Sequence, residues 1–288
     1  MHYYRVATDT GPHVLVDTGE QIHDITASKP RITRFIDVAR ASHITDKSID
    51  ELTRALIADA PTVSADLSAD AQLPVVPEEV WACGVTYQIS EEAREAESGL
   101  PEVYLDVFES ERPEVFLKGT ASRTVGPGEA IGVRGDSDWN TPEPEFAIVL
   151  YDGEPIGYTI GNDVSSRSIE GANPLYLPQA KIYERSCSLG PCISTPETIG
   201  DPHDIRMEMT IERDGKICYQ DATSTALMDR TCDELVSYWR RHNTVPEIAV
   251  LLTGTALVPE DEFSLSAGDT VIIDMESIGV LENPVIDV

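Results

Sequence analysis

Residues 143–163 read EPEFAIVLYDGEPIGYTIGND, two apolar runs separated by the polar stretch Asp152-Gly153-Glu154. Apolar runs of this length, broken by turn-forming residues, are typical of two antiparallel strands joined by a hairpin. Side chains at positions i and i+2 of a strand point to the same face, so Glu143 and Glu145 are expected to project together. The stretch therefore predicts a β-hairpin that carries two neighbouring carboxylates at its open end.

The length of the turn decides whether a third carboxylate joins this pair. With a three-residue loop over 152–154, Tyr151 pairs with Pro155, and Asp163 lies opposite Glu143 on the face of both glutamates. A two-residue loop would place Asp163 on the opposite face. We expect the three-residue loop, and with it three converging carboxylates.

Three carboxylates on one face repel one another unless a cation lies between them. Carboxylate oxygens with open positions beside them suit Mg²⁺ or Mn²⁺, which prefer oxygen ligands in octahedral geometry. The six histidines, at positions 2, 13, 23, 43, 203 and 242, lie far from this stretch, which disfavours zinc. Glu143, Glu145 and Asp163 are therefore candidate metal ligands; the alternative is a set of exposed acids on a strand in an acid-rich chain.

Two ionisable residues outside the hairpin are candidates for catalysis. Lys181 is one of only five lysines in the chain. A metal cation nearby would favour its neutral amine, which can act as a base. Glu114, just ahead of an apolar run at 115–117, is the second candidate. The alternatives are a surface lysine in a loop and one surface acid among 51.

The charge of the chain excludes several classes of partner. The 288 residues carry 21 Lys+Arg against 51 Asp+Glu, a formal net charge of −30. Such a surface repels the phosphates of nucleic acid and of anionic membranes. The acids are spread along the chain, and no leader or membrane span is visible, so we expect a cytoplasmic protein adapted to high salt. The alternative is an ordinary acidic protein of a bacterium.

The pattern of short apolar runs predicts two domains. Residues 1–74 read as a small domain with a strand at 14–16, helices at 34–39 and 49–56, and a polar connector at 60–72. From residue 75 to 288, short strands alternate with Gly, Pro and Asp, which is typical of a β-rich core. One helix is expected there, over 231–241. None of the five cysteines forms a CxxC pair, so a zinc site or disulfide framework is not expected.

Motifs in the stretch from about Val80 to the C-terminus resemble, in order, those of the fumarylacetoacetate hydrolase superfamily. They are FLK at 116–118, GPG at 126–128, EPE at 143–145, GYTIGNDVSSR at 157–167, Lys181, LGP at 189–191, TGT at 253–255, GD at 268–269 and GVLEN at 279–283. The resemblance implies a mixed, β-rich α+β fold, with a β-roll core and a small N-terminal α/β domain. It also implies one Mg²⁺, with Mn²⁺ as an alternative, held by Glu143, Glu145 and Asp163, and a homodimer or homotetramer.

Departures from the family pattern narrow the activity. Hydrolases of the family carry a water-activating His and Glu three and six residues after a Tyr, whereas Tyr87 is followed by Ser90 and Ala93. The Asp that usually follows the Arg of the ND motif is Ser168 here. Residues 157–191 are instead similar to the archaeal branch that dehydrates 2-keto-3-deoxy pentonates in pentose degradation. The resemblance thus implies a Mg²⁺-dependent dehydratase that forms 2,5-dioxopentanoate, with the arabinonate and xylonate series both open.

Further residues are expected to contact the 2-keto sugar acid. Lys118 would hold a carboxylate or a ligand glutamate, Thr255 would bond the substrate carboxylate, and Arg112 or Arg167 would orient it. The alternative for Arg167 is a structural ion pair. Lys181 is the expected base and Glu114 the group at the departing hydroxyl, or the reverse. Two rivals remain: an acylpyruvate hydrolase, decarboxylase or tautomerase of the same fold, and a regulatory protein that senses a keto acid.

Overall fold

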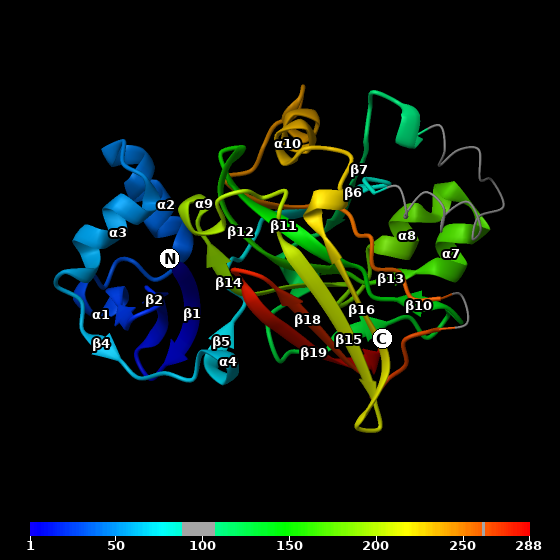
Figure 1. Ribbon diagram of the computed structural model, residues 1–288, viewed down its shortest axis with the longest axis horizontal. Helices are drawn as coiled ribbons and strands as arrows, with labels where there is room; N and C mark the ends of the chain where they lie inside the picture. Colours follow the sequence, from blue (N-terminus) through cyan, green and yellow to red (C-terminus); the bar gives the residue numbers. More distant parts are fainter. Residues whose placement is uncertain (88–106, 261–262) are drawn as a thin grey trace.

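The computed structural model describes residues 1–87, 107–260 and 263–288. In these ranges the chain forms the expected mixed, strand-rich α+β fold (Figure 1). The larger sheet is 12-stranded in the described part of the chain. Its strands, in spatial order, are β4 (Thr62–Val63), β3 (Ile22–Asp24), β2 (Gly11–Asp17), β1 (His2–Thr8), β14 (Cys187–Ser194), β12 (Glu154–Asp163), β11 (Pro144–Tyr151), β17 (Ile248–Leu252), β6 (Glu79–Gly84) and β7 (Glu114–Gly119), with β5 (Ala71–Gln72) on β1 and β8 (Thr124–Val125) on β14.

A second sheet and several short helices complete the described structure. The second sheet runs β16 (Lys216–Ser224), β15 (Arg206–Arg213), β18 (Thr270–Met275), β19 (Gly279–Asp287) and β9 (Ile131–Val133), and β10 (Asn140–Thr141) pairs with β13 (Ser165–Ser166). The helices are α1 (Ile25–Ser28), α2 (Phe35–Thr45), α3 (Ile49–Ile57), α4 (Leu67–Asp70), α7 (Arg167–Ala172), α8 (Leu177–Lys181), α9 (Pro196–Ile199) and α10 (Cys232–Arg240), with 3₁₀ turns at Ala121–Arg123, Pro174–Tyr176 and Thr225–Leu227. Among the described residues, no helix has the length and hydropathy that a bilayer crossing requires.

Strand β11 lies between two hydrophobic cores because its apolar side chains alternate. Phe146, Ile148 and Leu150 pack into a core with the second sheet and α10. Ala147 and Val149 pack on the other side, in a core that includes residues of α2 and of the N-terminal strands. A strand covered on both faces reads as a continuous apolar run, as 146–150 does. The hairpin that bears the acids is therefore anchored in the most buried part of the sheet.

The predicted turn of this hairpin is wrong, although the predicted alignment of its far end is right. Tyr151 pairs with Glu154, not with Pro155, so the loop has two residues. Asp152 and Gly153 have φ of 48° and 81°, and two successive positive φ values define the type I′ turn that Asp-Gly favours. A bulge then inserts one extra residue, Ile156, between the Leu150–Pro155 and Val149–Gly157 pairs.

The bulge returns the register to the one that a three-residue loop would have given. Pro144 pairs with Asn162, and the Asp163 amide donates to the Glu143 carbonyl at 2.9 Å. Asp163 therefore lies opposite Glu143, on the face of both glutamates.

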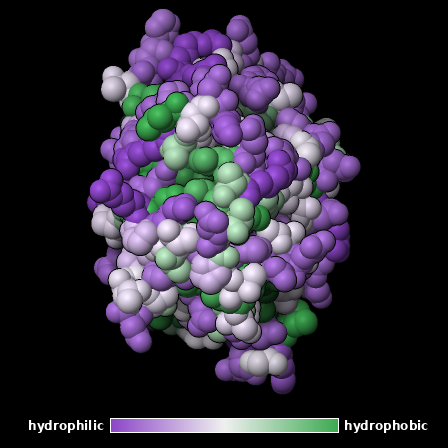
Figure 2. Space-filling model, turned by 90° about the vertical axis from the view of Figure 1, so that its left-hand side faces the viewer, coloured by the Kyte–Doolittle hydropathy of each residue, from purple (hydrophilic) through white to green (hydrophobic). Residues whose placement is uncertain are grey.

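The N-terminal elements gather at one end of the molecule, blue in Figure 1. Strand β1 continues the large sheet, because His2 and Tyr3 pair with Ser194 and Ile193 of β14. The polar connector expected at 60–72 contains the short elements β4, α4 and β5. A domain division between residues 74 and 75 stays a prediction. Figure 2 views the molecule from this end, where hydrophilic residues surround apolar ones near the centre.

Candidate metal centre and active site

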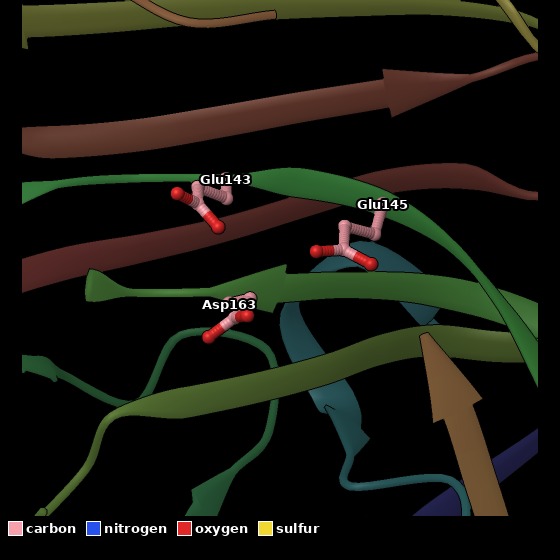
Figure 3. A group of neighbouring side chains, drawn as sticks. All are labelled: Glu143, Glu145 and Asp163. Carbon is pink, nitrogen blue, oxygen red and sulfur yellow. The ribbon is translucent and has the colours of Figure 1, made fainter. Parts of the chain in front are cut away.

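Three buried carboxylates meet at the open end of the β11–β12 hairpin. Glu143 directly precedes β11, Glu145 belongs to it, and Asp163 ends β12. Their side chains point toward one another (Figure 3), and one oxygen of each lies within 4.8 Å of the others. The residues are only 1–2 % exposed. Burial excludes the alternative that they are solvated acids on a strand surface.

Three cationic side chains surround the carboxylates. Lys181 Nζ lies 2.7 Å from Glu143 Oε2 and 3.3 Å from Asp163 Oδ2, and Arg167 lies 2.7 Å from Glu143 Oε1. Lys118 Nζ contacts Asp163 Oδ1 and donates to the carbonyls of Val164 and Lys181. Lys118 thus holds Asp163 in place.

Burial and mutual repulsion raise the pKa of Glu145 well above its ordinary value. Desolvation is the largest cause, followed by the charges of Asp163 and Glu143, whereas the Gly254 amide and Lys181 act in the opposite direction. A divalent cation among the three acids would remove this repulsion. The donor set, all oxygen and all buried, fits Mg²⁺ or Mn²⁺.

The cavity at the carboxylates is small. It has a volume of about 10 Å³, and its lining includes all three acids, Arg167 and Lys181. A volume of roughly 10–15 Å³ holds one water-sized species. The cavity thus has room for a cation.

Lys181 belongs to a helix and not to a surface loop. It is the last residue of α8, its side chain is 1 % exposed, and its Nζ also donates to Ser165 Oγ at 2.7 Å. The ring of Phe116 lies beside the ammonium, with 5.5 Å from Nζ to the ring centroid. The structure therefore places Lys181 in the group of acids, where the sequence left its position open.

The carboxylate of Glu114 lies beside the site because Gly84 leaves space for it. Gly84, the last residue of β6, pairs with Glu114 of β7. A Cβ at position 84 would lie 1.9 Å from Glu114 Oε2, so only glycine leaves room for this carboxylate. Gly84 itself lines the small cavity. Alternation along the strand puts Glu114 and Phe116 on one face of β7. Lys118 lies at a register shift of this strand and reaches the site by its contact with Asp163.

The other predicted contact residues lie at different distances from the acids. Thr255 lines the small cavity, and its Oγ1 accepts a hydrogen bond from the Leu257 amide. Arg112 is exposed and lies over the ring of Tyr238, 5.8 Å from its centroid. It lines a second, larger cavity together with Glu114. The structure thus brings Thr255 and Arg167 to the carboxylates but leaves Arg112 at the periphery.

Sequence reasoning assigned no role to Glu170, although it is 3 % exposed beside the site. It lies in α7, 3.6 Å from Arg167 and 3.9 Å from Lys181. The Ser166 hydroxyl caps α7 by accepting from the Ile169 amide. Helix α7 was not expected, so the i,i+3 spacing that pairs Arg167 with Glu170 went unused. Ser165 was missed because a lone serine carries no pattern.

Comparison of the chain with known proteins identifies its family. The model of the fumarylacetoacetate (FAA) hydrolase C-terminal domain matches residues 79–286. The chain belongs to the fumarylacetoacetate hydrolase family. A probable 2-keto-3-deoxyxylonate dehydratase of Haloferax volcanii is 56% identical over 99% of both chains. A 2-dehydro-3-deoxy-D-arabinonate dehydratase of Saccharolobus solfataricus is 42% identical over 74% of this chain and 73% of its own.

Solved structures of the fumarylacetoacetate hydrolase family agree with the fold. A 2-keto-3-deoxy-D-arabinonate dehydratase complexed with magnesium and 2,5-dioxopentanoate superimposes with a TM-score of 0.85 and 31% identity, covering 100% of this chain and 99% of its own. The apo form of a dehydratase with the same name gives a TM-score of 0.85 and 32% identity, and it also covers 100% of this chain and 99% of its own. The expected α+β fold and family are therefore confirmed.

Two departures from the fumarylacetoacetate hydrolase pattern have different outcomes. Ser168, which replaces the usual Asp after the Arg of the ND motif, bonds Ser137 Oγ at 2.8 Å. Ser137 Oγ also accepts from Ser166, the residue that caps α7, so this position supports the helix of Arg167 and Glu170. Ser90 and Ala93, at the positions of the water-activating pair, lie outside the described residues.

Proposed function

We propose that the protein is a Mg²⁺-dependent hydro-lyase that converts a 2-keto-3-deoxy-pentonate into 2,5-dioxopentanoate and water. The observation that carries the proposal is the contact of Lys181 with Glu143, a base candidate 2.7 Å from a candidate metal ligand in a buried group of three carboxylates. The 56% identical relative bears the name of such a dehydratase. The solved relative that holds magnesium also holds 2,5-dioxopentanoate.

Glu143, Glu145 and Asp163 would hold the ion, and their burial and oxygen donors fit it. When bound, Mg²⁺ supplies a fixed positive charge that polarises the carbonyl of a 2-keto acid and so acidifies its C3 protons. Lys118 keeps Asp163 turned toward the other two acids. Arg167 does the same for Glu143.

Lys181 and Glu114 are the proposed proton-transfer groups. Lys181 Nζ, as a neutral amine, takes a proton from C3, and Glu114 gives a proton to the C4 hydroxyl, which leaves as water. The carboxylate of Glu114 points toward Gly84 at the edge of the cavity, whereas Lys181 lines it. In the reverse assignment, the carboxylate of Glu114 takes the C3 proton and the ammonium of Lys181 gives a proton to the C4 hydroxyl.

The product requires two further proton movements. Loss of water leaves a C3–C4 double bond and an alcohol at C5. Transfer of a proton from C5 to C3 moves the double bond to C4–C5, and the resulting enol becomes the C5 aldehyde when C4 is protonated. These reaction steps involve no net oxidation or reduction, so the reaction needs no redox cofactor.

We propose Thr255 and Arg167 as contacts of the substrate carboxylate and Arg112 as a more distant orienting group. Thr255 and Arg167 line the small cavity with the carboxylates. Lys118, with its ammonium on Asp163 and two carbonyls, acts on the substrate through Asp163.

We also propose that the protein works in the cytoplasm at high salt, as a homodimer or homotetramer, in the degradation of pentoses. The net charge of −30 supports adaptation to salt. The assembly follows from family resemblance. The choice between the arabinonate and xylonate series is left to the substrate panel below.

A substrate panel tests the proposal. The purified protein in molar KCl with Mg²⁺ receives 2-keto-3-deoxy-D-arabinonate, 2-keto-3-deoxy-D-xylonate, an acylpyruvate or oxaloacetate, and products are identified by NMR. We expect 2,5-dioxopentanoate from at least one of the two pentonates. Pyruvate or CO₂ released from the acylpyruvate, with no dehydration, would favour a hydrolase or decarboxylase; faster enolisation of oxaloacetate would favour a tautomerase. Binding without turnover of any compound would favour a sensor.

A further inference from the structure

A second cavity adjoins the metal site and has the size of a ligand pocket. Its volume is about 320 Å³, against about 10 Å³ for the cavity at the three carboxylates. Small-molecule pockets begin at roughly 300 Å³. The small cavity has room for one ion-sized species. A five-carbon substrate bound to that ion would therefore extend beyond it, and the larger cavity has the volume to take it.

Two carboxylates of the larger cavity lie close to residues that line the small one. Glu114 and Glu170 both line the larger one. Glu170 lies 3.9 Å from Lys181 and 3.6 Å from Arg167, which line the small cavity, and Glu114 points toward Gly84, which lines it too. A molecule with its keto acid end at the metal site and its other end in the larger cavity would therefore come close to both acids.

The remaining lining of the larger cavity is mostly apolar. It consists of Val107, Arg112, Pro113, Val115, Pro174 and Leu177. In such surroundings a carboxylate is a strong and directional acceptor for a hydroxyl group. The proposed function gives Glu114 to the departing C4 hydroxyl, and Glu170 is the other carboxylate of this lining that a hydroxyl on the last carbon would meet.

We propose that Glu170 accepts a hydrogen bond from the terminal hydroxyl of the substrate and thereby selects hydroxylated 2-keto acids over unsubstituted ones. The inference rests on the proposed function for the identity of the substrate. It makes Glu170 a specificity-determining residue. It also accounts for a buried acid that neither binds the metal nor transfers a proton in the proposed reaction.

A pair of unreactive ligands tests the inference without turnover. 5-Hydroxy-2-oxopentanoate and 2-oxopentanoate differ only in the C5 hydroxyl, and neither has a C4 hydroxyl to lose. Their affinities for the wild type and for Glu170→Gln are measured by calorimetric titration with Mg²⁺ in molar KCl. The solution equilibria of each ligand cancel when its affinity is compared between proteins. For the preference of the wild type between the two ligands, affinities are calculated from the open-chain concentrations, which NMR gives.

The wild type is expected to prefer the hydroxylated ligand. Glu170→Gln should bind it about tenfold more weakly, the difference between a charged and a neutral acceptor, with the affinity for 2-oxopentanoate unchanged. The matched control is Glu184→Gln, the same substitution at an exposed acid three residues after Lys181 in the sequence, which should leave both affinities unchanged.

Two results would overturn the inference: no preference in the wild type, or an equal loss for both ligands in Glu170→Gln. An equal loss would mean that Glu170 acts by holding Arg167 and Lys181. Should Glu170→Gln fail to fold, Glu170→Asp, which keeps the charge but shortens the side chain, has to show the same selective loss.

Turnover of 2-keto-3-deoxy-pentonate by the wild type is measured alongside. Preference for the hydroxyl without turnover would leave the role of Glu170 standing and reject the dehydratase. Turnover without the preference would reject the role of Glu170 alone.

Discussion

At the scale of residues, the part of the site that the structure describes holds more buried acids than buried bases. The described structure places four acids, Glu143, Glu145, Asp163 and Glu170, against three bases, Lys118, Arg167 and Lys181. A buried charge without a partner costs several kcal/mol, of order 3–5 when one member of a pair is missing. The excess of acid is therefore a physical reason to expect a bound cation.

Replacement of Lys181 separates proton transfer from metal binding. Lys181→Met should lower kcat about 10²- to 10⁴-fold, the usual contribution of a general base, while Mg²⁺ still raises the Tm. The measurement pairs steady-state kinetics with thermal unfolding in Mg²⁺ and in EDTA. The exposed Lys47→Met is the matched control and should behave as wild type. A kcat near the wild-type value would remove Lys181 from the reaction.

The raised pKa of Glu145 predicts how the metal-free protein responds to pH. The folded state keeps the Glu145 proton to a higher pH than the unfolded state, whose carboxyl titrates near its ordinary value of 4.5. The folded state thus binds more protons above that pH, and stability falls as pH rises toward the folded pKa.

Thermal unfolding in EDTA across pH checks this sign. The Tm of the wild type should fall with rising pH more steeply than that of Glu145→Gln, and saturating Mg²⁺ should flatten the wild-type curve. The exposed Glu282→Gln controls for the loss of one charge from an acidic chain. Parallel curves for wild type and Glu145→Gln would show that Glu145 is not the group responsible.

At the scale of elements, the hairpin positions the site through a turn and a bulge that offset each other. The alternation of Glu143 and Glu145 could be predicted from sequence because strand periodicity is local. Asp-Gly indicates a two-residue turn, but nothing in residues 154–157 marks Ile156 as an inserted residue. The position of Asp163 beside the two glutamates was thus predicted correctly, but from a loop length that was wrong. Helices α7 and α8 are too short for periodicity to reveal them, so the burial of Lys181 and Glu170 could not be read from the chain.

Removal of the bulge residue should remove the metal site. Deletion of Ile156 leaves the two-residue turn in place and shifts β12 by one residue, which turns Asp163 to the opposite face of the sheet. The deletion variant should lose the rise in Tm with Mg²⁺. Ile156→Ala keeps the register and should retain the rise, despite some loss of packing. A metal response that survives the deletion would mean that the bulge does not set the register.

At the scale of the whole molecule, the surface charge and the buried site respond to different ions. A formal charge of −30 repels itself, and the Debye length shortens from about 10 Å at 0.1 M salt to about 3 Å at 1 M. Hydrophilic residues cover most of the face in Figure 2, where screening acts. The carboxylates of the metal site are only 1–2 % exposed and are screened much less.

A lower salt concentration is expected to destabilise the protein when the Mg²⁺ concentration is held constant. In saturating Mg²⁺, the Tm should fall when KCl is lowered from molar to about 0.1 M, because repulsion between surface acids is no longer screened. Calorimetry over a series of KCl concentrations measures the dependence of the Tm on salt. Because Mg²⁺ is held at a saturating concentration, occupancy of the metal site does not change along the series. A Tm that does not change with KCl would contradict adaptation to high salt.

The most direct test of the central claim is the metal dependence of dehydration in Glu143→Gln. The amide keeps the shape of the side chain but removes the charge that faces Lys181 and Arg167. NMR of 2-keto-3-deoxy-pentonate with the wild type and Mg²⁺ should show one 2,5-dioxopentanoate formed per substrate consumed, and EDTA should stop it. Glu143→Gln, folded by circular dichroism, should form no product at any Mg²⁺ concentration that activates the wild type. Mg²⁺-dependent product formation by Glu143→Gln at the wild-type rate would contradict the account, because the metal would then act at another site.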